Sequence, residues 1–266
     1  MIAGYEHFAA LARRLQWDEA AIDLRANVDA WGRLEDGLRE RVLGLVAGFC
    51  VGEASVAAEL GPFAAAAGPL AADCFEAQAR DERRHARFFE RVAAELVPGA
   101  AARERAAPGV APRERVAAGA AVRERLAPEF LDLFEVRLPA AARSLAAGES
   151  GLADAVGLYH MVLEGVVFGA GLQALVEAAA GLPGLRRGAE LVLRDERWHI
   201  GFGARCLQDA DPAPETVARI VAEGEAAATA WSDVGAEHAE RAVSILRRRL
   251  GAIRSIRATS HLRPAV

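Results

Sequence analysis

Two segments of the chain repeat the pattern Asp-Glu-x-x-His. The first contains Glu82 and His85, and the second contains Glu196 and His199. On a helix, residues three apart lie roughly 60° apart on one face and one turn apart, so both side chains of each pair can hold the same ion. A single Glu-x-x-His is weak evidence, because it arises by chance on helices rich in alanine, arginine and glutamate. Its repetition indicates metal chemistry.

Each motif is preceded, one helix earlier, by a glutamate in apolar surroundings. Glu53 stands 29 residues before Glu82, and Glu164 stands 32 residues before Glu196. A helix, a short turn and a returning helix would bring both members of each pair to a similar depth. Four glutamates and two histidines from four helices are the ligand set of the ferritin-like di-iron and di-manganese carboxylate proteins. The six residues therefore predict a dimetal site.

Two aspartates are placed to support this site. Carboxylates can bridge two metal ions, and each imidazole anchors one ion while leaving positions open for dioxygen. A metal-binding histidine usually donates its other ring N–H to a carboxylate or carbonyl group. Asp81 and Asp195 each precede a ligand glutamate by one residue, and we expect each to serve the histidine of the opposite helix; the alternative is an exposed helical charge. The remaining histidines are interpreted as surface or packing residues: His7, His160, His238 and His261.

The elements that position these residues are predicted to be helices throughout. Alanine, leucine, arginine and glutamate dominate, and apolar residues recur at spacings of three and four. We expect an all-α fold, a ferritin-like four-helix bundle with additional flanking helices, forming one domain over residues 1–266. Glycine and proline pairs, such as Gly61-Pro62 and Gly68-Pro69, are expected to mark turns. The predicted helices are 6–15, 33–60, 69–96, 122–147, 152–180, 184–209, 214–230 and 233–257.

Residues 98–128 form a repeat-like insertion of alanine, arginine and glutamate within this domain. Arg-Glu-Arg recurs there with a period of ten residues among alanine, glycine and proline. Such a segment buries little, which favours a solvated connection over a lid or docking segment.

The predicted helix 152–180 is apolar nearly all round, which is typical of a helix inside a bundle. Its interior carboxylate, Glu164, must be neutralised by protonation, a cation or a metal ion, because an unpaired buried charge is very costly. The same carboxylate argues against a membrane span.

Composition excludes several classes of function. The 266 residues include 37 acidic and 32 basic residues, for a net charge of −5, and contain no long run of like charges. Nucleic acid and membrane surfaces are therefore not expected as partners. All basic residues are arginines, which excludes lysine Schiff-base chemistry and a P-loop. Three widely spaced cysteines and the lack of a signal-like start predict free thiols in the cytoplasm.

Over about residues 15–210 the sequence resembles the ribonucleotide reductase small-subunit superfamily, and more particularly its ligand-binding oxidase branch. The resemblance is carried by short stretches at 17–19, 49–56, 81–89, 159–165 and 195–203. It implies a helical bundle, usually homodimeric, that holds Fe/Fe or Mn/Fe and activates O2. By position, one metal would be bound by Glu53, Glu82 and His85 and the other by Glu164, Glu196 and His199, with Glu82 and Glu196 as bridges.

The resemblance also implies roles for two aromatic residues. Trp17 falls where small subunits keep a tryptophan that is linked through the position of Asp195 toward a ligand histidine, which suggests an electron path; an anchoring aromatic residue is the alternative. Tyr159 matches the tyrosine that ligand-binding oxidases join to a valine. Ser55 stands at the valine position, so we expect no crosslink of that kind; its hydroxyl could bond a ligand or its own helical turn.

One departure from the family pattern favours the oxidase branch over ribonucleotide reduction. Phe89 stands where many small subunits have the tyrosine that stores a radical, and the chain contains only two tyrosines, so a radical cannot be stored on a tyrosine at that position. Phe89, Phe168 and Phe202, with Phe88, are candidates to line an apolar pocket, although such residues are more often core.

We therefore predict an O2-dependent dimetal oxidase or oxygenase that acts on a largely apolar small molecule, with an electron-donor protein as partner and the homodimer as assembly. The alternatives are a radical-generating ribonucleotide reductase small subunit and a non-catalytic ferritin-like metal-binding protein.

Overall fold

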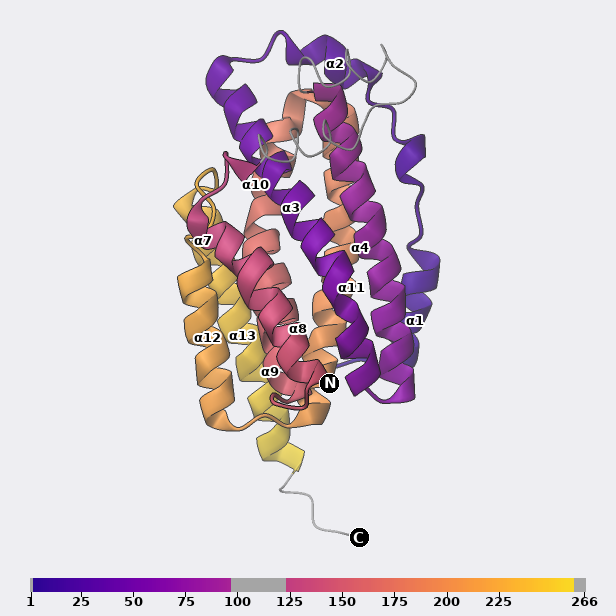
Figure 1. Cartoon of the computed structure of the whole chain (residues 1–266), viewed down its shortest axis with the longest axis vertical. Helices are drawn as coiled ribbons and strands as arrows, with labels where there is room; N and C mark the ends of the chain where they lie inside the picture. The colour runs from indigo at the N-terminus through magenta and orange to yellow at the C-terminus, as the bar shows by residue number, and fades with distance from the viewer. Residues whose placement is uncertain (1, 97–122, 261–266) are drawn as a thin grey trace.

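The computed structural model describes residues 2–96 and 123–260, and within these ranges it contains helices and connecting turns but no strand. The predicted all-α fold is confirmed. Four long helices form the central bundle (Figure 1). They are α3 (Asp36–Ala66), α4 (Pro69–Leu96), α11 (Pro183–Ala210) and a composite helix made of α9 (Leu152–Val156), η3 (Gly157–Phe168) and α10 (Gly169–Ala178).

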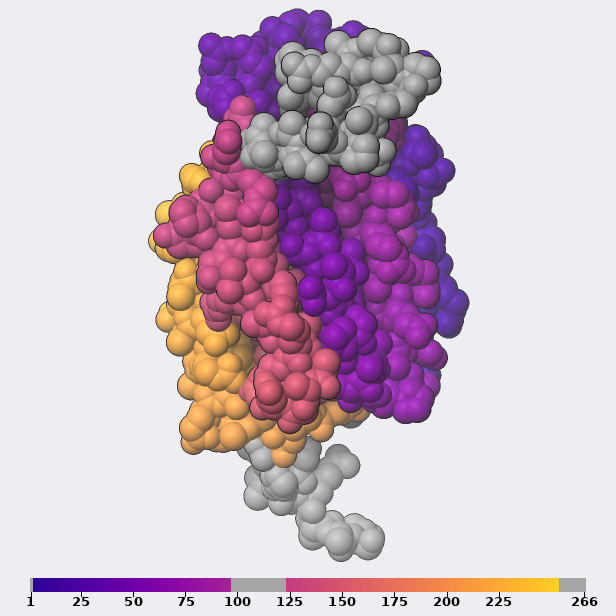
Figure 2. Space-filling model, in the orientation of Figure 1, coloured from indigo at the N-terminus to yellow at the C-terminus, as the bar shows by residue number. Residues whose placement is uncertain are grey.

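The flanking helices cover three sides of this bundle. α1 packs against α4 and α11, α8 packs against α3, and α12 and α13 pack against η3. Figure 2 shows the outer surfaces of α8, α3 and α4 side by side on one face. The flanking elements are α1 (Tyr5–Arg14), η1 (Glu19–Ala21), α2 (Arg25–Trp31), α7 (Pro128–Leu131), η2 (Asp132–Arg137), α8 (Leu138–Ala146), η4 (Ala179–Gly181), α12 (Pro214–Ala227) and α13 (Ala236–Ser260).

Two helix boundaries in the structure differ from the predicted ones, and each lies near a proline. The expected turn at Gly61-Pro62 is wrong, because α3 continues through Pro62 to Ala66. Pro62 removes one hydrogen bond to the carbonyl of Ala58, and Ala58 is exposed, so water can satisfy that carbonyl. The helix expected from residue 122 begins instead at Pro128, since the residue before a proline is forced into an extended conformation. Sequence reasoning also missed the short helix α2.

The composite helix contains a long π-helical segment, η3, which was predicted as ordinary α-helix. The wider π turn is uncommon and frequently occurs at functional sites. Here it carries Tyr159, His160 and Glu164, all fully buried. Its local register therefore differs from the 3.6-residue period used to interpret the sequence.

Two helices, α3 and the helix from Leu152 to Gly181, are long and apolar enough to cross a membrane by length and composition alone. In the helix from Leu152 to Gly181, 89% of the most apolar stretch is buried inside the bundle, and this helix carries Glu164. Both are the core helices of this fold. Residues 98–122 of the predicted insertion lie outside the described residues.

Candidate metal centre

The six predicted ligands meet in the middle of the bundle. Every one of these side chains is at most 1% exposed. Glu53 comes from α3, Glu82 and His85 from α4, Glu164 from η3, and Glu196 and His199 from α11. Helical geometry places the two side chains of each Glu-x-x-His pair on one face, and the packing of the four helices brings the six side chains together.

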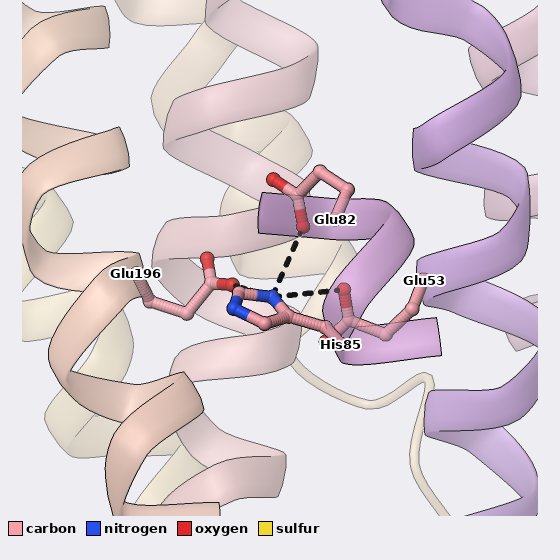
Figure 3. Close-up of side chains that lie close together, drawn as sticks. All are labelled: Glu53, Glu82, His85 and Glu196. Atoms are coloured by element: carbon pink, nitrogen blue, oxygen red, sulfur yellow. Dashed lines mark ion pairs between the residues drawn. The ribbon is translucent and has the colours of Figure 1, made fainter. Parts of the chain in front are cut away.

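One half of the centre surrounds His85 (Figure 3). Its Nδ1 atom lies 3.3 Å from Glu82 Oε2, 3.5 Å from Glu53 Oε2 and 3.5 Å from Glu196 Oε1. Potential ligand atoms of these four residues lie within 4.8 Å of one another. Three carboxylates and one imidazole thus point at one small volume.

The other half surrounds His199. Its Nδ1 atom lies 3.1 Å from Glu82 Oε1, 3.6 Å from Glu164 Oε1 and 3.7 Å from Glu196 Oε2. Glu82 and Glu196 therefore each direct one oxygen to each histidine. That geometry is what a bridging carboxylate needs, and the ligand assignment itself stays a prediction.

The donor set fits two divalent cations. Both oxygens of Glu53 and Glu196, one oxygen each of Glu82 and Glu164, and Nδ1 of both histidines are buried without a hydrogen-bond partner among the described residues. Native proteins rarely leave so many buried polar atoms unsatisfied in one place. Four ionised carboxylates carry four negative charges, which two divalent ions would balance. The unpaired buried atoms and the charge are therefore both consistent with a pair of divalent metal ions.

The protonation of the cluster follows from burial and crowding. Burial, together with the neighbouring carboxylates, raises the pKa of Glu53 and Glu164 well above the usual value, and raises that of Glu196. Burial alone would lower the pKa of His85 and His199, but the surrounding glutamates raise both well above the usual value. Glu82 is the exception: burial would raise its pKa, but the two histidines hold it well below the usual value.

Each histidine presents its second ring nitrogen to the expected aspartate of the opposite motif. His85 Nε2 lies 3.3 Å from Asp195 Oδ2, and His199 Nε2 lies 3.5 Å from Asp81 Oδ2. Both aspartates are buried. Burial would raise the pKa of Asp195, but hydrogen bonding to His85 and the His85 charge hold it far below the usual value. An ionised Asp195 fixes the N–H of His85 on Nε2 and leaves Nδ1 free to bind a metal. His199 Nε2 makes only the longer ion-pair contact with Asp81 and has no hydrogen-bond partner within the described residues.

Trp17 lies where the resemblance suggested. Its Nε1 donates to Asp195 Oδ2 at 2.7 Å, and its ring is stacked with that of His85, with 6.2 Å between centroids. Arg84 supports the same group, because its guanidinium bonds both Asp81 and Asp195 at 2.7 and 2.9 Å.

Sequence reasoning missed a polar layer formed by Gln78 and His160. The Gln78 amide nitrogen donates to Glu164 Oε1 at 2.6 Å, to the Tyr159 hydroxyl at 2.8 Å and to Glu82 Oε1 at 3.2 Å. Its oxygen lies 3.1 Å from His160 Nε2, and Tyr159 in turn donates to Glu82 at 2.9 Å. Gln78 and His160 each stand four residues before a ligand, and that helical spacing is the signal that could have identified them.

We predict that replacing Gln78 with methionine lowers the free energy of unfolding by about 2 kcal/mol, because His160 and Glu164 would each lose a buried hydrogen-bond partner. Urea denaturation measures this change. Gln173→Met is the matched control, since the partly buried Gln173 bonds only its own helix. Equal stability of the two variants would contradict the prediction.

The opposite end of the centre is aromatic. Phe49, Phe89 and Phe168 stand one helical turn from Glu53, His85 and Glu164, and Phe49 contacts the other two rings, with centroids 4.8 and 5.3 Å apart. Phe168 packs so closely on Gly52 that a Cβ there would lie 2.6 Å from its ring.

Of the four predicted pocket residues, Phe89 and Phe168 belong to this aromatic end, and Phe88 packs against Phe89 and Trp17. Phe202 packs at the other end, against Phe75 and His160. All four are fully buried, and the predicted pocket itself stays a prediction. Ser55 is partly buried, and no hydrogen bond of its hydroxyl is found within the described residues; the roles suggested for it stay predictions.

Several solved structures share this architecture, and three of them are variants of an R2-like ligand-binding oxidase with an aerobically reconstituted Mn/Fe cofactor. A tyrosine-to-phenylalanine variant is 20% identical over 95% of this chain and 93% of its own, with a TM-score of 0.73. A valine-to-isoleucine variant is 23% identical over 94% and 79%, with a TM-score of 0.65. A valine-to-leucine variant is 22% identical over 98% and 86%, with a TM-score of 0.66. The chain has the fold of the R2-like ligand-binding oxidases.

The R2-like fold accounts for the placement of the centre. Its central helices bring the two Glu-x-x-His motifs and the two lone glutamates together, and its flanking helices keep water away from them. No family model and no curated protein sequence matches the chain.

Proposed function

We propose that the protein is a dimetal-carboxylate oxidase that uses O2 to oxidise a largely apolar small molecule by hydroxylation or a related two-electron oxidation. One observation carries the proposal: among six buried donor residues, both oxygens of Glu53 and Glu196, one oxygen each of Glu82 and Glu164, and Nδ1 of both histidines have no hydrogen-bond partner within the described residues. The similar R2-like structures were solved with a Mn/Fe cofactor, which supports the same kind of centre here.

The residues present define how an Fe/Fe or Mn/Fe pair would be held. Glu53 and His85 would bind one ion and Glu164 and His199 the other, with Glu82 and Glu196 bridging them. Such a pair supplies the reduction of O2 that no side chain of this chain can perform.

The protein's own contribution is orientation, exclusion of water and control of protons. Asp195 holds the His85 ring through its hydrogen bond to Nε2, and Asp81 faces Nε2 of His199, so both rings direct Nδ1 toward the centre. Gln78 holds one oxygen of Glu164, and the Tyr159 hydroxyl donates to Glu82. These contacts leave the carboxylates oriented before any ion binds, which lowers the cost of assembling the site.

The aromatic end supports an apolar substrate. Phe49, Phe89 and Phe168 offer carbon surfaces beside the ligand residues, whereas the end with Gln78 and Tyr159 is polar. An apolar substrate would contact carbon surfaces at the aromatic end, whereas at the polar end it would contact hydrogen-bonding groups and gain less from burial.

A stored tyrosyl radical is not part of the proposal, because the corresponding residue is Phe89, which is stacked on Phe49. A homodimer, an electron-donor protein and a cytoplasmic location remain proposals that accompany the oxidase function.

Metal quantification coupled to rapid-mixing absorption spectroscopy tests the function. Metal-free protein is loaded anaerobically with Fe(II), with and without Mn(II), and is then mixed with O2. We expect two ions per chain and a transient visible absorption band, whose decay is accelerated by substrate. Apolar small molecules can then be screened by that acceleration.

Two variants on α11 serve as controls. Glu196→Ala removes a shared carboxylate and should abolish the transient band, whereas Glu190→Ala changes a partly exposed glutamate that pairs only with Arg186 and should leave the band unchanged. One ion or none per wild-type chain, with no reaction with O2, would refute the oxidase proposal.

A further inference from the structure

A surface hollow lies directly outside the Trp17 end of the metal centre. It encloses about 350 Å³ and is lined by residues 16–19 and by four arginines of α4, Arg80, Arg83, Arg84 and Arg87. We call it the basic hollow. Three of its arginines follow one another at spacings of three and four residues, so they form one exposed stripe of the helix.

The charge of the basic hollow opposes that of the whole chain. The chain carries a net charge of −5, whereas the lining carries four arginines against Asp18 and Glu19. Glu19 is paired with Arg87, and the buried Arg84 is paired with Asp81 and Asp195. Arg80 and Arg83 are exposed and pair with no carboxylate of the described residues. The hollow therefore presents the unpaired positive charges of Arg80 and Arg83 on a protein whose net charge is negative.

Trp17 separates the basic hollow from the ligands. Its indole is partly exposed, with the Arg84 guanidinium 5.1 Å from its ring on one side and His85 stacked on it. From Trp17 Nε1 a 2.7 Å hydrogen bond leads to Asp195, which lies 3.3 Å from His85 Nε2. A molecule in the hollow cannot touch the ligand carboxylates past this indole, but an electron can cross these short contacts.

We propose that the basic hollow is the docking site of an acidic electron-donor protein that carries a flavin or an iron–sulfur cluster. The proposal rests on the oxidase function above, which requires a reductant. Each transfer oxidises the donor's cofactor by one electron and reduces the metal pair by one, and the electron passes from the donor through Trp17 toward His85.

Charge complementarity selects a protein as the occupant. An exposed stripe of arginines attracts an acidic surface over a distance and raises the rate of encounter, and that effect falls as salt screens the charges. The arginine planes can also hold carboxylates with two hydrogen bonds. An apolar substrate would gain nothing from this lining.

The first test measures binding to metal-free protein, so that it does not depend on the chemistry of the centre. The probe is a bacterial flavodoxin, a small acidic flavin protein, and its affinity is measured by fluorescence anisotropy at about 20 and 300 mM salt. The variant is the pair Arg80→Glu and Arg83→Glu. The matched control is the pair Arg143→Glu and Arg241→Glu, which reverses two exposed arginines on α8 and α13 and changes the net charge equally.

We expect the Arg80 and Arg83 pair to weaken binding about tenfold or more at low salt, and the control pair to weaken it far less. High salt should remove the difference. Equal losses in both pairs, or a wild-type affinity that does not respond to salt, would overturn the proposal. Binding of inorganic phosphate that is lost in the variant, without flavodoxin binding, would also overturn it and would assign the hollow to a small anion.

The second test follows reduction of metal-loaded protein by reduced flavodoxin and, separately, by dithionite. The Arg80 and Arg83 pair should slow the first reaction and leave the second unchanged. Trp17→Phe should accept electrons more slowly at saturating flavodoxin, where a change in affinity does not affect the rate. If flavodoxin docks as expected and the loaded protein nevertheless fails to react with O2, the oxidase proposal fails while the docking site stands. If the loaded protein reacts with O2 after dithionite and flavodoxin neither binds nor reduces it, the docking proposal fails alone.

Discussion

Replacing His199 with alanine is expected to remove one of the two metal ions and to leave the other bound. His199 Nδ1 is the only imidazole nitrogen that faces Glu164 among the described residues, while His85 keeps its own three carboxylates. Replacing Glu82 with alanine should do more, because its two oxygens face both histidines at 3.3 and 3.1 Å. We expect that variant to lose most of both ions.

Metal content per chain, measured by elemental analysis after loading and desalting, checks this directly, and thermal unfolding gives a second measure. An ion present at 1,000 times its Kd adds about 4 kcal/mol to the free energy of unfolding, so each lost ion should lower the melting temperature of the loaded protein by several degrees. His238→Ala is the matched control, because His238 is a buried histidine that pairs with Glu177 far from the centre. Two ions retained by His199→Ala would refute the ligand assignment.

Metal-free protein is expected to lose stability as the pH rises, and metal-loaded protein is not. Glu53, Glu164 and Glu196 have folded-state pKa values above the ordinary value of 4.5, and His85 and His199 have values above 6.5. A raised folded-state pKa means that the folded protein holds a proton that the unfolded chain has released. The resulting stability is complete below the ordinary pKa and is lost as the pH rises through the raised one.

Two measurements on the same protein check this sign. Urea denaturation between pH 6 and 9 should show the metal-free protein losing about 1.4 kcal/mol per pH unit for each extra proton held by the folded state. Calorimetric titration with Mn(II) in buffers of different ionisation enthalpy should show protons released on binding, because the metal takes the place of those protons. Glu82, Asp81 and Asp195, whose pKa values are lowered, act in the opposite sense only below about pH 4.5. A metal-free protein that becomes more stable toward pH 9 would contradict the prediction.

The helical elements that carry the ligands could be predicted closely because their signals are local. The helix expected at 69–96 matches α4, and the helix expected at 184–209 differs from α11 by one residue at each end. Glycine and proline mark those ends, and helical periodicity places the motifs between them. The prediction failed where a local signal was overridden, as at Pro62, where α3 continues past the proline.

Contacts between side chains on different helices could not be predicted from local sequence signals and depend on the R2-like fold. The spacing of Gln78 and His160 from the ligands was visible, but only the packing of η3 against its neighbours shows that the two side chains meet and hold Glu164. The same holds for the aromatic residues: Phe89 and Phe168 gather at one end of the centre, and Phe202 lies at the other, although all three are equally apolar.

The sequence by itself predicted the six candidate ligands and the two aspartates beside them, because a Glu-x-x-His pair on a helix places both side chains on one face wherever the helix lies. Tertiary structure alone decided that Glu82 and Glu196 each face both histidines, that Gln78 joins the cluster, and that Trp17 lines a surface hollow with four arginines of α4. These features depend on distances between helices far apart in the chain, and such distances are set by the packing of whole helix faces rather than by the spacing of residues within one helix.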